Sequence, residues 1–166
     1  MAASIRWKKL TIPAALTGGV VGWLVYTGGG YTGILMLASF FILGTVATSW
    51  HAKVSSAEGP GSNNQTGSND QKGAAAQSTR TTGQVLANGG VAALAGLAIM
   101  FWPGQQTVLE IAMAASLSSA TADTLSSELG MVYGRRYYNI LTGRRDQRGL
   151  DGVVSLEGTL IGIAGS

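Results

Sequence analysis

The chain has 166 residues, of which 46% are hydrophobic and 11% are Asp, Glu, Lys or Arg, against about 25% charged residues in a typical soluble domain. It has no cysteine, which excludes disulfides, cysteine-ligated metal centres and thiol nucleophiles. The net charge is +3, and 25 residues are glycine. This composition excludes an ordinary soluble domain. It predicts an all-α polytopic bundle of membrane helices that forms a single integral membrane domain over residues 1–166.

Four apolar segments follow one another along the chain, at 12–26, 31–50, 85–102 and 108–133. The second has twenty residues without a charge, which at about 1.5 Å per residue cross a hydrocarbon core of about 30 Å. We predict four full transmembrane helices at these positions. A fifth apolar run at 152–166 is short for a span, so we expect a truncated fifth helix and a domain that is incomplete at its C-terminus.

The first segment resembles a signal peptide, because an apolar run follows the basic residues Arg6, Lys8 and Lys9. However, Tyr26 and the residues after it offer no A-x-A-like cleavage site, and a second apolar segment follows almost at once. We therefore expect an uncleaved first helix.

The positive charges indicate how the helices are oriented. All eleven basic residues fall in regions 1–9, 51–84 and 135–151, and none lies in the short turns 27–30 and 103–106. With four spans the three basic regions share one side of the bilayer, which the positive-inside rule makes cytoplasmic, together with the N-terminus. A bacterial inner membrane is the simplest location. Residues 55–82, rich in Gly, Ser, Asn and Gln, are expected to form a flexible polar cytoplasmic linker.

Acidic residues within an apolar segment are the first candidates for function. Asp123 and Glu128 are five residues apart, which places them about 140° around a helix, so they cannot chelate one metal from one straight face. A magnesium ion could join Asp123 to a substrate phosphate while Glu128 serves a second ion or a neighbouring helix. A buried hydrogen-bonded network that holds helices together is an equally good interpretation. Glu110 is expected to be a solvated residue at the outer end of the fourth helix.

Further polar residues gather at the same predicted edge of the membrane. Thr48 to Lys53 end the second helix, where His51 is interpreted as an interfacial residue rather than a ligand. Residues 80–90 open the third helix, and the amides of Asn88-Gly89-Gly90 could approach a phosphate there, although a packing kink is the favoured interpretation. Glu157 is a third acid in an apolar stretch.

Two repeated features have structural interpretations. The small-xxx-small pairs Gly18/Gly22, Gly29/Gly33 and Gly158/Gly162 predict close helix packing. The five arginines at 135–148 are interpreted mainly as determinants of topology, with phosphate binding as a further role for some.

Membrane carboxylates, basic residues and glycine-rich helix starts on the nucleotide-containing side fit phosphoryl transfer to a lipid phosphate, a reaction that needs charge neutralisation and positioning. Two other interpretations stay open: a small-ion or lipid transporter whose path the acids line, and a non-catalytic packing protein. A nucleic-acid partner is excluded, because every basic cluster flanks a predicted membrane span.

Three runs carry a family resemblance: QVLANGG (84–90), ATADTLSSELG (120–130) and GVVSLEGT (152–159). They resemble signatures of the integral membrane family of domain of unknown function ninety-two, which includes transmembrane protein nineteen of animals and the phytyl-phosphate kinase of plants. The resemblance covers nearly the whole chain and looks closest to the plant kinase branch. It implies transfer of a nucleotide phosphate, often from CTP, to a prenyl monophosphate such as phytyl phosphate.

The motifs, together with the chemistry of the residues in and beside them, predict site residues of two kinds. The catalytic candidates are Asp123, Glu128 and Glu157, of which Asp123 and Glu128 would bind metal, inferred to be Mg²⁺. Candidates for binding substrate or phosphate are Arg80, Asn88, Gly89, Ser127, Ser155 and Thr159. The implied partners are the lipid bilayer, a prenyl phosphate, and CTP or ATP. Family members usually continue for several more helices, so the resemblance also suggests that this chain is a fragment.

Overall fold

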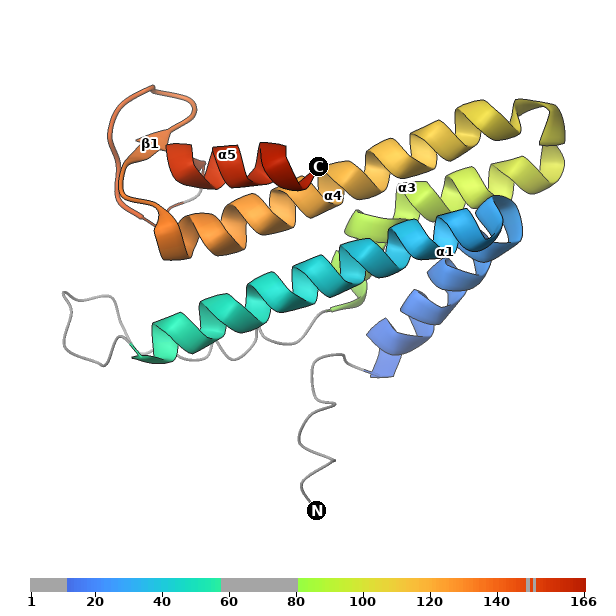
Figure 1. Cartoon of the computed structure of the whole chain (residues 1–166), viewed down its shortest axis with the longest axis horizontal. Coiled ribbons are helices and arrows are strands. Elements are labelled where there is room, and N and C mark those ends of the chain that lie inside the picture. The colour runs from blue at the N-terminus through green and yellow to red at the C-terminus, as the bar shows by residue number, and fades with distance from the viewer. Residues whose placement is uncertain (1–11, 58–80, 149, 151) are drawn as a thin grey trace, which may run out of the picture. The chain divides into compact units, whose positions relative to one another are not determined.

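The structure is a computed structural model that describes residues 12–57, 81–148, 150 and 152–166. Its elements in chain order are α1 (Ile12–Ala57), α3 (Thr82–Phe101), the short 3₁₀ helix η2 (Pro103–Gln105), α4 (Gln106–Tyr133), β1 (Tyr137–Asn139), β2 (Val153–Ser155) and α5 (Leu156–Gly165) (Figure 1). The basic N-terminal cluster at 1–9 and most of the predicted linker lie outside the described residues.

Helix α1 contains a sharp turn at Gly30, where φ is 57° and ψ is −145°. Only glycine adopts this region of backbone conformation readily, because a side chain there would clash with the neighbouring peptide groups. The turn divides α1 into two arms, and the rings of Tyr26 and Tyr31 meet edge to face across it, with centroids 5.9 Å apart. The two arms correspond to the first two predicted segments.

The described residues form two compact units, and α1 and α4 each contribute to both. The first unit contains α1 up to Ala38, α3, η2 and α4 up to Leu117. Its core is a cluster of buried side chains: Val21, Val25, Ala92, Ala93, Ala95, Ile99, Met113 and Leu117. Three of these eight residues are alanines of α3, and such small side chains let helices approach one another closely.

Glycine contacts make the closest approaches in this first unit. A Cβ atom at Gly28 would collide with the backbone of Gly96, so α1 and α3 touch through their main chains. A Cβ at Gly33 would lie 2.9 Å from Val25 O, and one at Gly29 would lie 3.1 Å from Met113 Sδ. The predicted packing role of Gly29/Gly33 is therefore confirmed, whereas Gly18 and Gly22 have only ordinary contacts at 4.0 and 3.9 Å.

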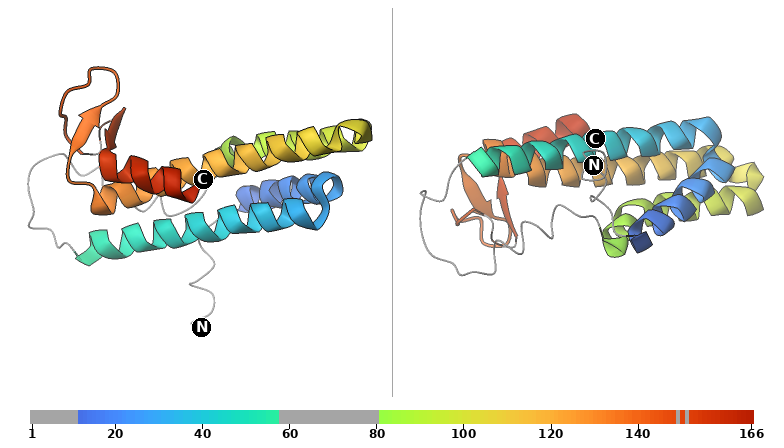
Figure 2. Two further views of the ribbon diagram at one scale, coloured as in Figure 1. Left: turned by 45° about the horizontal axis from the view of Figure 1, so that its top comes forward. Right: turned by 90° about the horizontal axis from the view of Figure 1, so that it is seen from below.

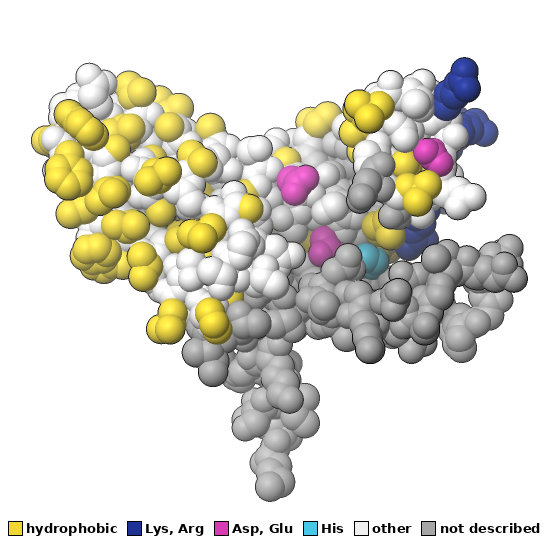
Figure 3. All heavy atoms as spheres, turned by 180° about the vertical axis from the view of Figure 1, so that it is seen from behind, with side chains coloured by type: hydrophobic (Ala, Val, Ile, Leu, Met, Phe, Trp, Pro, Cys, Tyr) yellow, Lys and Arg dark blue, Asp and Glu magenta, His cyan; other side chains and the backbone are white. Residues whose placement is uncertain are grey.

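Large apolar side chains also cover much of the surface (Figure 3). In the first unit they include Leu16, Trp23, Leu35, Leu94, Phe101 and Ile111. Exposed apolar side chains in such number mark a surface that does not face water. By length and composition, two described stretches are apolar enough to cross a membrane, Pro13–Ser55 and Thr82–Phe101, and the first contains the turn at Gly30.

The second unit contains α1 from Ser39, α4 from Ser118, the two strands and α5. Strands β1 and β2 pair antiparallel, with Tyr137 opposite Ser155, and β2 leads directly into α5 (Figure 2). This small sheet departs from the all-α prediction, although helices make up most of the fold. The predicted pair Gly158/Gly162 packs α5 against α4, since Cβ atoms there would lie 2.7 Å from Ser126 O and 3.0 Å from Ala122 O.

Two helix boundaries differ from the sequence prediction. Helix α3 begins at Thr82, three residues before the predicted apolar segment, because Thr81 and Gln84 form a capping box. Helix α1 continues to Ala57, so residues 55–57 of the predicted linker are helical.

Candidate functional site

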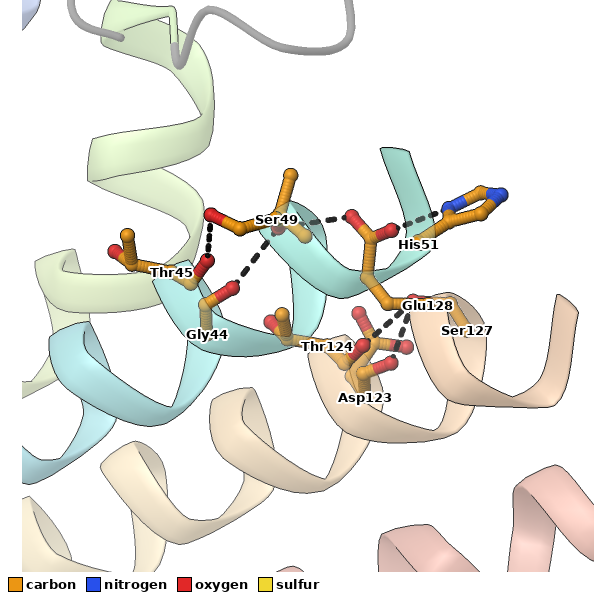
Figure 4. A network of polar contacts seen from close by, with 9 residues as sticks. Gly44, Thr45, Ser49, His51, Asp123, Thr124, Ser127 and Glu128 are labelled. Carbon is orange, nitrogen blue, oxygen red and sulfur yellow. Dashed lines mark hydrogen bonds and ion pairs between the residues drawn. The ribbon is translucent and has the colours of Figure 1, made fainter. Parts of the chain in front are cut away.

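In the second unit, Glu128 of α4 interacts with two side chains of α1 (Figure 4). His51 Nδ1 lies 2.7 Å from Glu128 Oε2, and the Thr48 hydroxyl donates to Glu128 Oε1 at 3.1 Å. The side chains of His51 and Glu128 are 23% and 24% exposed, so this pair is only partly accessible to water. A carboxylate with two such partners is held in one orientation.

The Thr48 hydroxyl links this contact to the backbone, because it also donates to Gly44 O at 2.9 Å. Thr48 and His51 are three residues apart and therefore lie on the same face of α1, where both reach Glu128. We call these three residues, Thr48, His51 and Glu128, the carboxylate clamp.

Two aromatic residues lie beside the clamp in sequence and join the same helices. Trp50 Nε1 donates to the Tyr133 hydroxyl at 2.9 Å, and the ammonium group of Lys53 lies 5.8 Å from the centre of the Trp50 ring. Both aromatic side chains are about half exposed, at 45% and 50%. Trp and Tyr with polar tips are enriched at the level of lipid headgroups, so this pair is of the kind expected at a membrane–water interface.

Asp123 differs from Glu128 although both lie on α4. Its side chain is exposed, and in the described parts of the chain its carboxylate makes no hydrogen bond or ion pair. Its backbone carbonyl accepts hydrogen bonds from Ser127 Oγ at 2.8 Å and Ser126 Oγ at 3.1 Å. As the spacing predicts, the two acids diverge: Glu128 faces α1 and Asp123 remains open.

The donors suit a magnesium ion only in part. The described residues hold no group of three His, Asp or Glu side chains that could bind a metal on its own. Mg²⁺ needs only one or two carboxylates when substrate phosphates and waters complete its shell, and the open Asp123 carboxylate fits that requirement. Glu128 is occupied by Thr48 and His51 and does not fit as a second ligand of the same ion.

Three further candidates, Ser155, Glu157 and Thr159, lie at the start of α5, and Glu157 also contacts the segment after α4. Ser155 is buried and caps α5 by accepting from Gly158 N at 3.0 Å, and Thr159 Oγ1 donates to Ser155 O at 3.0 Å. Glu157 Oε2 accepts from Arg135 N at 3.3 Å. The backbone N–H of Glu157 itself, and then that of Arg135, lower the pKa of the Glu157 carboxyl below its ordinary value.

Ser127 is also engaged locally, because its hydroxyl donates to Asp123 O and, at 3.1 Å, to Thr124 O. Bonds of this kind are common for serine in helices and do not by themselves indicate a ligand.

The remaining candidates belong to the first unit or lie outside the described residues. Asn88 and Gly89 lie inside α3, which starts at Thr82, so their amides are not at a helix start as the anion-site hypothesis required. A Cβ atom at Gly89 would lie 2.9 Å from Val21 Cγ1, which supports the packing interpretation. Arg80 is outside the described residues.

Comparison with known proteins identifies the family. The model of the family described as "Integral membrane protein DUF92" matches residues 1–166. The chain belongs to this family. The resemblance stated from the three sequence runs is thereby confirmed, and so is location in a membrane.

Two curated relatives match the chain. An uncharacterised membrane protein of the cyanobacterium Synechocystis, sll0875, is 32% identical over 164 residues, which cover 98% of this chain and 59% of the relative. The chloroplastic protein VTE6 of Arabidopsis thaliana is 30% identical over 162 residues, which cover 93% of this chain and 43% of the relative. The chain thus spans about half the length of these relatives. No solved structure matches.

Sequence reasoning missed the roles of Thr48 and His51. It placed the end of the second helix at the same membrane edge as Glu128, but it interpreted His51 as interfacial. The available signal was a histidine three residues after a threonine, on a helix expected to end beside a buried acid. That spacing is compatible with many arrangements, because it does not fix how one helix is rotated against another.

Proposed function

We propose that this chain forms part of a membrane prenyl-phosphate kinase, which transfers a nucleotide phosphate to a lipid monophosphate. The observation that carries the proposal is the different environment of two acids on α4. Glu128 is held by Thr48 and His51, whereas the carboxylate of Asp123 is exposed. An exposed carboxylate on the same helix as a fixed one, in an integral membrane protein of this family, suits the binding of phosphates at a bilayer surface.

The proposed topology has four spans: the two arms of α1, then α3 and α4. Helix α4 has 28 residues, long enough to cross a bilayer, although its three acids reduce its apolar character. The distribution of the basic residues supports a cytoplasmic N-terminus and a multi-pass location in a bacterial inner membrane. Glu128, the aromatic pair and the arginines of 135–148 would then lie at the cytoplasmic edge, where nucleotides are available.

In this proposal an oxygen of the prenyl phosphate attacks the terminal phosphorus of CTP or ATP. A new P–O bond forms, the bond to the bridging oxygen breaks, and the nucleoside diphosphate leaves. Mg²⁺, when bound, would neutralise the charge of the phosphate oxygens. Asp123 would hold that ion and thereby the phosphates, while the carboxylate clamp fixes the position of α4 and so of Asp123.

The test is to reconstitute the chain in liposomes, alongside a longer version that spans the full length of its curated relatives. Each sample is incubated with phytyl phosphate, magnesium and either CTP or ATP labelled at the terminal phosphate. We expect labelled prenyl diphosphate with at least one nucleotide. Absence of product from both inserted proteins with both nucleotides would overturn the kinase proposal.

A second candidate function rests on one observation, the contact between Glu128 and His51. Paired titratable groups within membrane helices also occur in proton and ion relays. A small-ion transporter would carry protons or cations across the same liposomes without nucleotide, and loss of that flux in a His51→Gln variant would favour it over the kinase.

A further inference from the structure

In the described part of the segment between α4 and α5, residues 137–148 form a hairpin. Strand β1 starts at Tyr137, four residues after the end of α4, and Tyr138 forms a bridge with Arg145. Asn139 organises the turn, since its Oδ1 accepts from Leu141 N at 3.0 Å and its backbone oxygen accepts from Gly143 N at 2.9 Å. The tip, residues 140–143, is therefore held in one conformation.

The tip of the hairpin exposes two large apolar side chains. Leu141 is 92% exposed and Ile140 is 65% exposed, although leucine and isoleucine are among the residues most often buried. The backbone of both residues is held, because Ile140 N donates to Gly152 O at 2.9 Å and Leu141 N donates to Asn139 Oδ1, while their side chains stay exposed. An apolar pair presented in this way by a fixed backbone needs an apolar environment outside the chain.

Positive charge surrounds this tip. Arg144, Arg145 and Arg148 are exposed, and in the described parts of the chain none of them forms an ion pair with a carboxylate. The nearest acid in sequence, Asp146, is used inside the hairpin, where it accepts from Asn139 Nδ2 at 3.2 Å and from Gln147 N at 2.8 Å. The three guanidinium groups are thus available to an anionic partner.

The hairpin starts at the level of the membrane interface. Tyr133, which bonds to Trp50, is the last residue of α4, and an interfacial aromatic pair marks the headgroup region. Only three residues, 134–136, separate Tyr133 from β1, and each extended residue spans at most about 3.6 Å, so the hairpin is within reach of that region. Apolar tip residues beside uncompensated arginines match the two layers of an anionic bilayer surface, acyl chains below and phosphates above.

We propose that the hairpin 137–148 docks on the surface of the bilayer that holds the chain, with Ile140 and Leu141 inserted among the lipids and Arg144, Arg145 and Arg148 bound to anionic phospholipid headgroups. The proposal rests on membership of a membrane family and on this geometry, and it does not require the kinase activity. Such docking fixes α5 and the end of α4 relative to the membrane surface.

The test uses a spin label attached to the cysteine of a Leu141→Cys variant. This cysteine is the only one in the variant, because the chain itself has no cysteine. The full chain is placed in nanodiscs of phosphatidylcholine alone or with phosphatidylglycerol. Collision of the label with a water-soluble nickel chelate is compared with collision with oxygen. In the discs that contain phosphatidylglycerol, we expect the label to collide less often with the nickel chelate and more often with oxygen than in the discs of phosphatidylcholine alone. Replacing the three arginines by glutamine should lower the ratio of docked to undocked hairpin in the phosphatidylglycerol discs by about 100-fold, since each arginine contributes about fivefold to binding at an anionic surface.

A matched variant with three lysines in place of the three arginines keeps the charge and should keep the shielding. Equal nickel access in both kinds of disc, or shielding that persists in the glutamine variant, would overturn the proposal. Shielding that appears only when CTP or ATP is added would also overturn it, because the arginines would then bind nucleotide phosphates.

Discussion

Glu128 and Asp123 lie on one helix and have different environments. The sequence left two interpretations of these acids equally open, a metal site and a hydrogen-bonded network between helices. Glu128 enters a network between helices with His51 and Thr48, while Asp123 stays available for a ligand. The angle of about 140° between the two positions could be derived from their spacing, but the partner of each acid could not. Partners depend on how α4 is rotated against α1, which no spacing within one helix reveals.

This difference predicts unequal effects on stability. Glu128→Ala should lower the free energy of unfolding by about 1.5–3 kcal/mol, the usual worth of hydrogen bonds to a charged group. Thr48→Val should cost about 1 kcal/mol, because a neutral hydroxyl donor is lost. Asp123→Ala, at an exposed site, should stay within about 0.5 kcal/mol of the wild type. Denaturant titration of the detergent-solubilised protein measures all three changes. A larger loss of unfolding free energy for Asp123→Ala than for Glu128→Ala would refute the predicted difference between the two acids.

The charge of Glu157 predicts a dependence on pH. Its pKa is lowered in the fold by backbone N–H groups, so its contribution to stability is present above the pKa of the unfolded chain and is lost as the pH falls through the lowered value. Thermal melts between neutral and acidic pH should therefore show a loss at low pH that Glu157→Gln reduces. Glu110→Gln is the control, because Glu110 is bonded to the Gln106 side chain and not to backbone N–H groups. An identical pH profile for wild type and Glu157→Gln would show that the backbone bonds are unimportant.

At the scale of elements, long apolar runs were predictable and short strands were not. The predicted segments 85–102 and 108–133 differ from α3 and α4 by only a few residues, since the apolar run itself must be helical in lipid. Strands β1 and β2 have three residues each, too few for an alternating pattern to be recognised in sequence. Capping at Thr81 extended α3 beyond its apolar run, a detail that the Thr-x-x-Gln spacing could have indicated.

The turn at Gly30 is the element that separates the arms of α1. Gly30→Ala should destabilise the protein by about 1–3 kcal/mol, because an L-residue is strained at this φ and ψ. Gly19→Ala is the matched control, since Gly19 is helical and a Cβ there meets no atom within 4 Å. Alanine favours helix, so that control should stabilise by about 0.5–1 kcal/mol. Thermal unfolding in detergent compares the two, and equal behaviour would indicate that the turn is not held by Gly30.

At the scale of the whole molecule, the composition and the family agree on a membrane protein. The chain covers 59% and 43% of the lengths of its two curated relatives. Composition could predict the membrane class because burial in lipid demands long apolar helices. It could not predict the substrate, because a phosphate site needs only a few polar residues, and these are also common in helix packing.

The most direct measurement is the rate of phosphate transfer to phytyl phosphate by the Asp123→Asn variant, compared with the wild type and with Glu110→Gln. All three are reconstituted to equal levels and given saturating nucleotide and magnesium. If Asp123 holds the ion and the phosphates, its amide variant should lose at least about 100-fold in rate, as enzymes do when a group that stabilises transition-state charge is removed. Glu110→Gln should retain the wild-type rate. Transfer by Asp123→Asn at the wild-type rate would contradict the assignment of Asp123 and with it the proposed site.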